Sequence, residues 1–264
     1  MFHDAYRVAA GGAPTHGKIL KGLSLLQKHD IPLNVLVCVT REAAPYPLEV
    51  YEFFKDLEIQ YIQFIPIVER IPDVEAVRLG MKNAAPPIPA GGRIDAEVTA
   101  WSVGPEAYGN ILIQIFNEWV YSDVGSVFVM NFEWALQAWM GLPSTICIFS
   151  KQCGRAVAVE HNGDIYSCDH YVYPRYRIGN ILTDGLKEMM TSDLQAQFGR
   201  DKEASLPKVC RKCEVLFACH GECPRHWFMT SDDGDPGMIC GKSQSIVLIY
   251  DITQPISPFT LKKT

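Results

Sequence analysis

The sequence between residues 147 and 240 contains eight of the chain's nine cysteines, spaced Cys147-x5-Cys153-x14-Cys168 and then Cys210-x2-Cys213-x5-Cys219-x3-Cys223-x16-Cys240. Where thiols are kept reduced, cysteines at such spacings are metal ligands more often than disulfides. Eight thiolates suffice for two sites of four, which fits two structural zinc ions and two iron-sulfur clusters equally well. A scatter of buried thiols is the remaining interpretation, because cysteine is often buried in protein cores.

The composition is typical of a globular protein with a real core. The chain has 264 residues, of which 48% are hydrophobic, and a net charge of -6 without long charged runs. This charge argues against nucleic acid as a partner and against a polybasic patch that would bind a membrane. No apolar run is long enough to cross a bilayer, and the first residues lack the pattern of a signal peptide. We therefore expect a cytoplasmic protein that binds neither nucleic acid nor membrane.

The first 66 residues alternate between helical and strand patterns. A helical period from Ile19 to Leu26 precedes an apolar run over residues 33–39, and a helix over 47–57 precedes a second apolar run over 59–68. Strand, helix and strand with short connections predict a parallel crossover. Both strands are expected to be buried, the first on both faces, so that Cys38 becomes a small core residue.

The middle of the chain is less regular. Residues 69–103 are rich in proline, glycine and alanine and predict a long loop or insertion, of a kind that often covers a site. A helix is expected over 105–121, a short strand over 127–131 and another helix over 133–140.

From residue 142 onward short strands and helices are expected. His161-Asn162-Gly163 separates two strand-like segments and is a typical signal of a β-hairpin. The second of these strands ends at Cys168, next to the carboxylate of Asp169. Short helices are expected over 181–190 and 192–201.

The order of the cysteine spacings resembles the SPASM domain of radical S-adenosylmethionine enzymes, and specifically the anaerobic sulfatase-maturating enzymes. The resemblance also rests on two segments, CGRAVAVEHNGDIYSCDHYVYP over residues 153–174 and IQFIPIVER over 62–70. It implies an α/β fold: the C-terminal part of a partial (β/α)6 radical SAM barrel over 1–141, with an insertion near 70–103, then a SPASM domain with a β-hairpin and short helices over 142–240. Residues 241–264 would form a tail that the resemblance does not cover.

The resemblance implies oxidation of a Cys or Ser of a sulfatase polypeptide to Cα-formylglycine. In this family a third 4Fe-4S cluster, held by a Cys-x3-Cys-x2-Cys motif, reduces S-adenosylmethionine to the radical that attacks the substrate. Two auxiliary 4Fe-4S clusters are held by cysteines, and an electron donor such as a ferredoxin or flavodoxin is implied as a partner. The implied ligands here are Cys147, Cys153, Cys168 and Cys223 for the first auxiliary cluster, and Cys210, Cys213, Cys219 and Cys240 for the second.

The resemblance also implies roles for four other residues. Asp169 would be the general base that removes the proton of the substrate thiol or hydroxyl, since a carboxylate is ionised near neutral pH. Gln63 would contact the substrate. Arg7 and Asn34 would bind S-adenosylmethionine, a guanidinium being suited to carboxylate recognition. Each has an ordinary structural alternative: a turn carboxylate, a core amide, or a surface ion pair.

One feature departs from the family: the sequence contains no Cys-x3-Cys-x2-Cys. We therefore expect this chain to correspond to the later part of a maturase and to be unable to cleave S-adenosylmethionine alone. Two alternatives stay open at this point. The chain could be a non-catalytic peptide-binding module that holds iron-sulfur clusters or zinc, or it could belong to a SPASM enzyme that modifies a different peptide.

Overall fold

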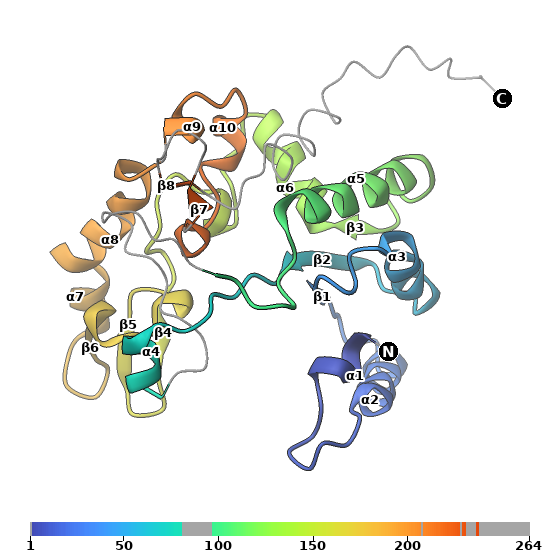
Figure 1. Cartoon of the computed structure of the whole chain (residues 1–264), viewed down its shortest axis with the longest axis horizontal. Coiled ribbons are helices and arrows are strands. Elements are labelled where there is room, and N and C mark those ends of the chain that lie inside the picture. Colours follow the sequence, from blue (N-terminus) through green and yellow to red (C-terminus); the bar gives the residue numbers. More distant parts are fainter. Residues whose placement is uncertain (1, 81–96, 207, 228, 231–235, 238–264) are drawn as a thin grey trace.

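The structure is a computed structural model that describes residues 2–80, 97–206, 208–227, 229–230 and 236–237 (Figure 1). Its first half is an α/β unit built on a parallel sheet, and its second half consists of short strands and helices. A parallel sheet with helices, followed by short strands and helices, is the mixed α/β arrangement expected from the sequence. The last part of the chain, which contains Cys240 and the expected tail, lies outside the described residues.

The first sheet has three parallel strands in the order β1-β2-β3. Strand β1 (Val35–Val39) pairs with β2 (Tyr61–Pro66) along its whole length, from Val35 opposite Ile62 to Val39 opposite Pro66. Strand β3 (Phe128–Val129) adds two residues on the other side of β2. The connection between β1 and β2 contains helix α3 (Pro47–Asp56), so the predicted strand-helix-strand unit is confirmed.

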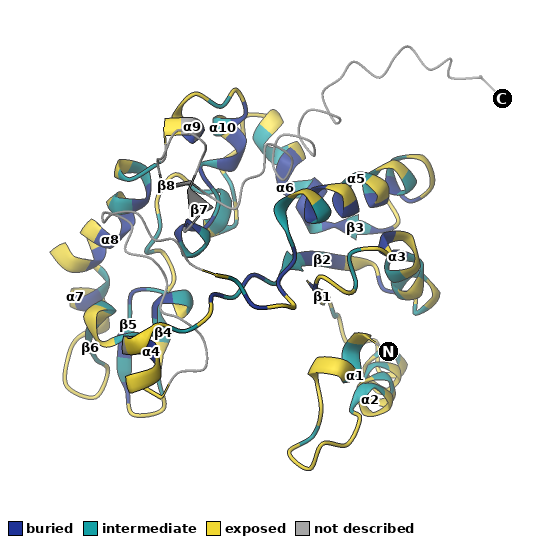
Figure 2. Ribbon diagram, in the orientation of Figure 1, coloured by how far each residue is buried: buried dark blue, intermediate teal, exposed yellow. Residues whose placement is uncertain are grey.

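The core lies between this sheet and two helices. Helix α3 and helix α5 (Pro105–Ser122) pack together on one face, and their apolar side chains meet those of β2 and β3. Figure 2 shows the buried stripe of α5 facing the sheet. Valine, isoleucine and aromatic residues dominate this core, including the fully enclosed Ile62, Phe64, Ile115 and Tyr51. Along β2, Ile62 and Phe64 point into the core, so Gln63 points to the opposite face.

Strand β1 is not buried on both faces, and this prediction was wrong. Leu36 and Cys38 are exposed, whereas Val35 and Val37 are half-buried on the face that packs against the core. Helix α2 (His16–Lys28), where a helix was expected, has no fully buried residue. The cause is position: β1 has a hydrogen-bonded neighbour on one side only among the described residues, and the face that bears Cys38 is uncovered there.

Two segments also differ from those expected. Residues 69–103 contain a short helix, α4 (Val74–Arg78), and an isolated bridge between Arg70 and Val98. Residues 81–96 of this segment are not described. Helix α6 (Met130–Trp139) begins where the strand was expected to continue, which leaves Asn131 in its first turn.

Asn131 extends the hydrogen bonding of β2 beyond the end of β3. Its Oδ1 accepts from the main-chain N–H of Phe64 at 2.9 Å, and its Nδ2 donates to the carbonyl of Phe64 at 3.0 Å. The same carbonyl accepts a hydrogen bond from Tyr108 Oη at 2.8 Å. A buried side-chain amide therefore replaces the missing strand residue and fixes the main chain directly after Gln63.

Replacement of Asn131 by leucine is expected to lower the free energy of unfolding by about 1 to 3 kcal/mol, because the N–H of Phe64 then loses its partner inside the core. Gln137→Leu on the same helix is the matched control, with an expected change within about 0.5 kcal/mol. The two variants can be compared by urea unfolding followed by tryptophan fluorescence. Equal losses in both would contradict the role of Asn131.

The second half of the chain has its own antiparallel sheet, in the order β4-β5-β6. Strands β4 (Ala158–Val159) and β5 (Asp164–Tyr166) form the predicted hairpin, and β6 (Arg177–Asn180) pairs with β5. The helices of this half are α7 (Leu186–Met190), α8 (Asp193–Ala204), α9 (Lys208–Arg211) and α10 (Leu216–Cys219). A two-residue pair, β7 (Met229–Thr230) and β8 (Pro236–Gly237), closes the described part.

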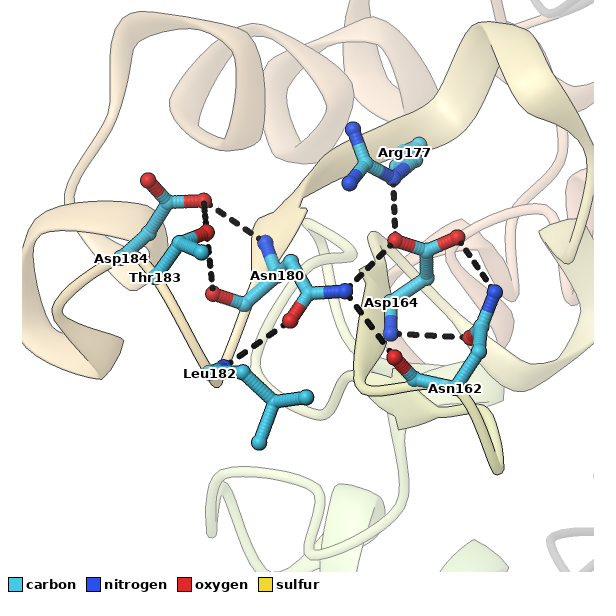
Figure 3. Close-up of polar contacts among 7 residues, drawn as sticks. All are labelled: Asn162, Asp164, Arg177, Asn180, Leu182, Thr183 and Asp184. Atoms are coloured by element: carbon cyan, nitrogen blue, oxygen red, sulfur yellow. Dashed lines mark hydrogen bonds and ion pairs between the residues drawn. The ribbon is translucent and has the colours of Figure 1, made fainter.

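The helix expected from residue 181 begins only at Leu186. A polar network ties the preceding turn to the hairpin (Figure 3). Asn180 Nδ2 donates to Asp164 Oδ1 at 3.0 Å, Asn180 Oδ1 accepts from the main-chain N–H of Leu182, and Asp184 accepts from that of Asn180. Asp164 also pairs with Arg177 at 2.6 Å. These side chains compete with helical hydrogen bonding and hold the segment as a turn.

The two halves contact each other directly. Helix α10 packs on α6 through Ala135, Val215 and Ala218, and Trp139 meets Phe217 edge to face with ring centroids 4.9 Å apart. Arg225 forms an ion pair with Glu69, which follows β2. The second half of the chain is thus joined to the first just beyond the end of β2.

Candidate metal centre

The first set of cysteines comes together from four separate loops. Cys147 begins a short 3-10 turn (Cys147–Phe149), Cys153 lies in the next loop, Cys168 follows β5, and Cys223 follows α10. Burial raises the pKa of Cys153, and the neighbouring thiol of Cys147 raises it further. Burial likewise raises the pKa of Cys168 to about 12 and that of Cys223 well above its ordinary value, with contributions from the other cysteines of the set.

The second set is formed by three described cysteines from a compact helical segment. Cys210 lies in α9, Cys213 two residues after that helix and Cys219 at the end of α10. The N–H of Cys213 donates to the carbonyl of Cys210 at 3.0 Å. Burial raises the pKa of Cys210 to about 12, and the thiols of Cys219 and Cys213 add to the shift. The expected fourth member, Cys240, lies outside the described residues.

Both sets have the donor chemistry of a metal site. The described cysteines form no disulfide with one another. Cys210, Cys219 and Cys223 are buried, whereas Cys147 is exposed. Grouped thiols repel each other as anions, and a cation reverses this penalty because it binds and stabilises the thiolates. The thiols therefore fit metal ligation, and the structure brings Cys153, Cys168 and Cys223 close enough to interact electrostatically. This donor chemistry suits an iron-sulfur cluster and zinc alike.

Helix α8 holds three of the four loops that carry the first set. Gln195, 2% exposed, donates to the carbonyls of Gly154 and Ser167, the residues next to Cys153 and Cys168. One turn later the helix approaches Cys153 so closely that a Cβ at Gly199 would lie 2.8 Å from its carbonyl oxygen. Lys202 then donates to the loop of Cys147. The three positions share one helix face, at i, i+4 and i+7. None was singled out from the sequence.

Asp169 lies at the edge of the first set. Its side chain is exposed, and its Oδ1 is 3.2 Å from Cys168 Sγ. The neighbouring His170 contacts the set from the other side, with Nδ1 3.3 Å from Cys223 Sγ. Cys168, Asp169 and His170 offer ligand atoms within 4.8 Å of one another, so a mixed Cys-Asp-His site is a geometric alternative. Cys168 also interacts with Cys153 and Cys223 of the first set, which favours the all-cysteine set.

The remaining site residues of the sequence prediction are more scattered. Gln63 lies in β2 on the face away from the helices, half-buried. Arg7 is exposed directly after helix α1 (Phe2–Tyr6), and Asn34 is exposed just before β1. Asn34 thus lies at the amino end of its strand, whereas Glu69 and its partner Arg225 lie beyond the carboxyl end of β2.

Comparison with known proteins agrees with this geometry. Residues 147–214 match the SPASM family, described as an iron-sulfur cluster-binding domain. A serine-type anaerobic sulfatase-maturating enzyme of Bacteroides thetaiotaomicron is 44% identical over 237 residues, which cover 90% of this chain and 56% of that protein. A cysteine-type enzyme of Clostridium novyi is 24% identical over 226 residues, covering 85% and 54%. The chain therefore spans about half the length of these curated relatives.

Solved structures show the same fold. A structure titled "Native anSMEcpe with bound AdoMet and Cp18Cys peptide" superposes with a TM-score of 0.76 at 22% sequence identity, covering 95% of this chain and 64% of that one. The described part of the chain has no helix long and apolar enough to span a bilayer.

Proposed function

This chain is a homologue of the anaerobic sulfatase-maturating enzymes, and on that premise we propose that it is the substrate-binding and auxiliary-cluster part of such a maturase. The reaction is the oxidation of a Cys or Ser in a sulfatase polypeptide to Cα-formylglycine. The proposal is supported by a relative 44% identical over 90% of the chain and by the cysteine sets of the SPASM half. A ferredoxin or flavodoxin would serve as the electron donor, in the cytoplasm.

We assign the two cysteine sets to two 4Fe-4S clusters. Cys147, Cys153, Cys168 and Cys223 hold the first, and Cys210, Cys213, Cys219 and Cys240 hold the second. Bound there, the clusters would supply centres that can accept an electron from the substrate. Helix α8 holds the loops that carry three of these ligands, through Gln195 and Lys202.

Asp169 is assigned as the general base. The observation that carries this role is the placement of an exposed carboxylate shortly after β5, beside the half-buried Cys168. A polypeptide can reach such a carboxylate, and the hairpin fixes its position relative to the first site. Gln63 lies on the face of β2 opposite Ile62 and Phe64, where it can contact the substrate main chain. Arg7 and Asn34 are assigned to S-adenosylmethionine.

The experiment supplies the radical-generating part and measures the product. The chain is fused behind the N-terminal part of the Bacteroides thetaiotaomicron relative, reconstituted without oxygen, and given sulfatase peptides with Ser or Cys at the target position. Formylglycine detected by mass spectrometry in either peptide is the expected result. A fusion that cleaves S-adenosylmethionine but forms no formylglycine in either peptide would contradict the proposal.

A second candidate is a peptide-binding module that makes no radical. It is favoured by one observation, the lack of a Cys-x3-Cys-x2-Cys motif in the 264 residues. For the same reason we expect the chain alone, with S-adenosylmethionine and dithionite, to form no deoxyadenosine. Deoxyadenosine formed by the purified chain would exclude this candidate and overturn that expectation.

A further inference from the structure

Lys202 is a fully enclosed lysine in the middle of the SPASM half. It lies near the end of α8 and is 1% exposed. Its Nζ donates to three carbonyl oxygens of one short loop, those of Cys147 at 3.2 Å, Ile148 at 2.8 Å and Ser150 at 2.6 Å. The side chain therefore holds the loop that presents the first cysteine of the first set.

The three hydrogen bonds determine the charge of the side chain. A neutral amine has two N–H groups, whereas an ammonium group has three and no lone pair. Three carbonyl acceptors at hydrogen-bond distance are satisfied only by the ammonium form. Lys202 is therefore a positive charge enclosed by protein.

An enclosed charge is costly unless a charge of opposite sign lies nearby. Among the described residues Lys202 forms no ion pair with a carboxylate within 4 Å. Burial lowers its pKa, and the charges that oppose this shift are, in order, those of Cys153, Cys223, Glu222 and Cys219. Two of these four belong to the first cysteine set. The ammonium therefore faces two thiols of that set together with the carboxyl group of Glu222, and a bound metal would hold those thiols as thiolates.

We propose that Lys202 is a positioning residue of the first cysteine site, which both anchors the Cys147 loop and, as a fixed positive charge, raises the reduction potential of the cluster held there. This inference rests on the proposed function. Net charge and hydrogen bonding around the ligands are established determinants of cluster potential. A nearby cation favours the reduced cluster, because reduction adds a negative charge.

The alternative is that Lys202 only anchors the loop and that its charge does not change the reduction potential of the cluster. Substitutions at Lys202 separate the two. Lys202→Met and Lys202→Gln remove the charge, and the glutamine keeps N–H donors for the loop; Lys202→Arg keeps the charge and the donors. The matched control is Lys151→Met. Lys151 belongs to the same loop region, its side chain is 65% exposed, and it pairs with Glu203 at 2.8 Å.

The first measurement is the midpoint potential of the first cluster in the anaerobically reconstituted chain, from a redox titration followed by electron paramagnetic resonance. In Lys202→Met and Lys202→Gln the equilibrium constant for reduction of the first cluster is expected to fall by at least about tenfold. This corresponds to a potential lower by about 59 mV for a one-electron couple. Lys202→Arg and Lys151→Met are expected to stay within about threefold, about half that shift. If the methionine variant fails to assemble its clusters, the glutamine variant decides.

The second measurement needs no cluster. Hydrogen exchange of a peptide spanning residues 147–150 is expected to become faster in Lys202→Met than in Lys151→Met, whether the chain holds iron, zinc or no metal. Unchanged exchange would overturn the anchoring role. Unchanged potentials in both neutral variants, or an equal fall in Lys202→Arg, would overturn the electrostatic role. A chain that binds only zinc would instead refute the proposed function, and the exchange result would still decide the anchoring.

Discussion

Replacement of Cys223 by alanine is expected to remove about four of about eight irons from the reconstituted chain, because one thiolate of the first four-cysteine cluster is lost. Cys223 is buried between α10 and the loop of His170, whose Nδ1 lies 3.3 Å from its Sγ. It is the member of the first set that lies within the second group of cysteines in the sequence. Iron and sulfide analysis measures the loss.

Cys38→Ala is the matched control for this prediction. Cys38 is exposed on β1 and belongs to neither cysteine set. Its replacement is expected to leave the iron content unchanged. If Cys223→Ala retains the full iron content, or if Cys38→Ala loses as much, the assignment of the first ligand set is wrong.

The second large effect is expected for Asp169→Asn in the fusion that carries the radical-generating part. Loss of a general base typically slows the step it serves by about 10²- to 10⁴-fold. Iron content and cleavage of S-adenosylmethionine are expected to persist, because the exposed side chain is not a member of either cysteine set. The rate of formylglycine formation, measured by mass spectrometry, therefore falls separately from the rate of deoxyadenosine formation.

Asp193→Asn provides the comparison. Asp193 is an exposed carboxylate in the first turn of α8, in the same half of the chain, and its replacement is expected to change turnover less than about threefold, since surface charges at a helix N-terminus contribute only about 0.3 to 1 kcal/mol. Equal turnover of the Asp169→Asn and unsubstituted proteins would refute the assignment of the base.

Local patterns in the sequence were sufficient for much of the fold. The apolar runs around β1 and β2 with α3 between them predicted the parallel unit, and Asn162-Gly163 predicted the hairpin, because both signals depend on residues close together in the chain. The burial of β1 was not predictable in this way. An apolar run does not reveal which neighbours cover it, and Cys38 proved exposed. The turn before α7 was missed because its polar network forms across strands, through Asp164 and Asn180.

The candidate site was only partly predictable. Spacing alone indicated two sites of four thiolates, whereas the division into sets came from the resemblance to a family, since residues as distant as Cys153 and Cys223 carry no mutual signal in the sequence. The role of α8 was not predictable at all. Gln195 and Lys202 look like ordinary polar positions of a surface helix, and only the fold turns them toward the loops of the cysteines.

The central claim is that the chain holds two iron-sulfur clusters through eight cysteines, and metal analysis of the anaerobically reconstituted protein tests it most directly. The account predicts about eight irons with a matching amount of sulfide per chain, and absorbance at about 400 nm that is lost on reduction. About two zinc ions per chain, with neither iron nor sulfide retained after reconstitution, would contradict it.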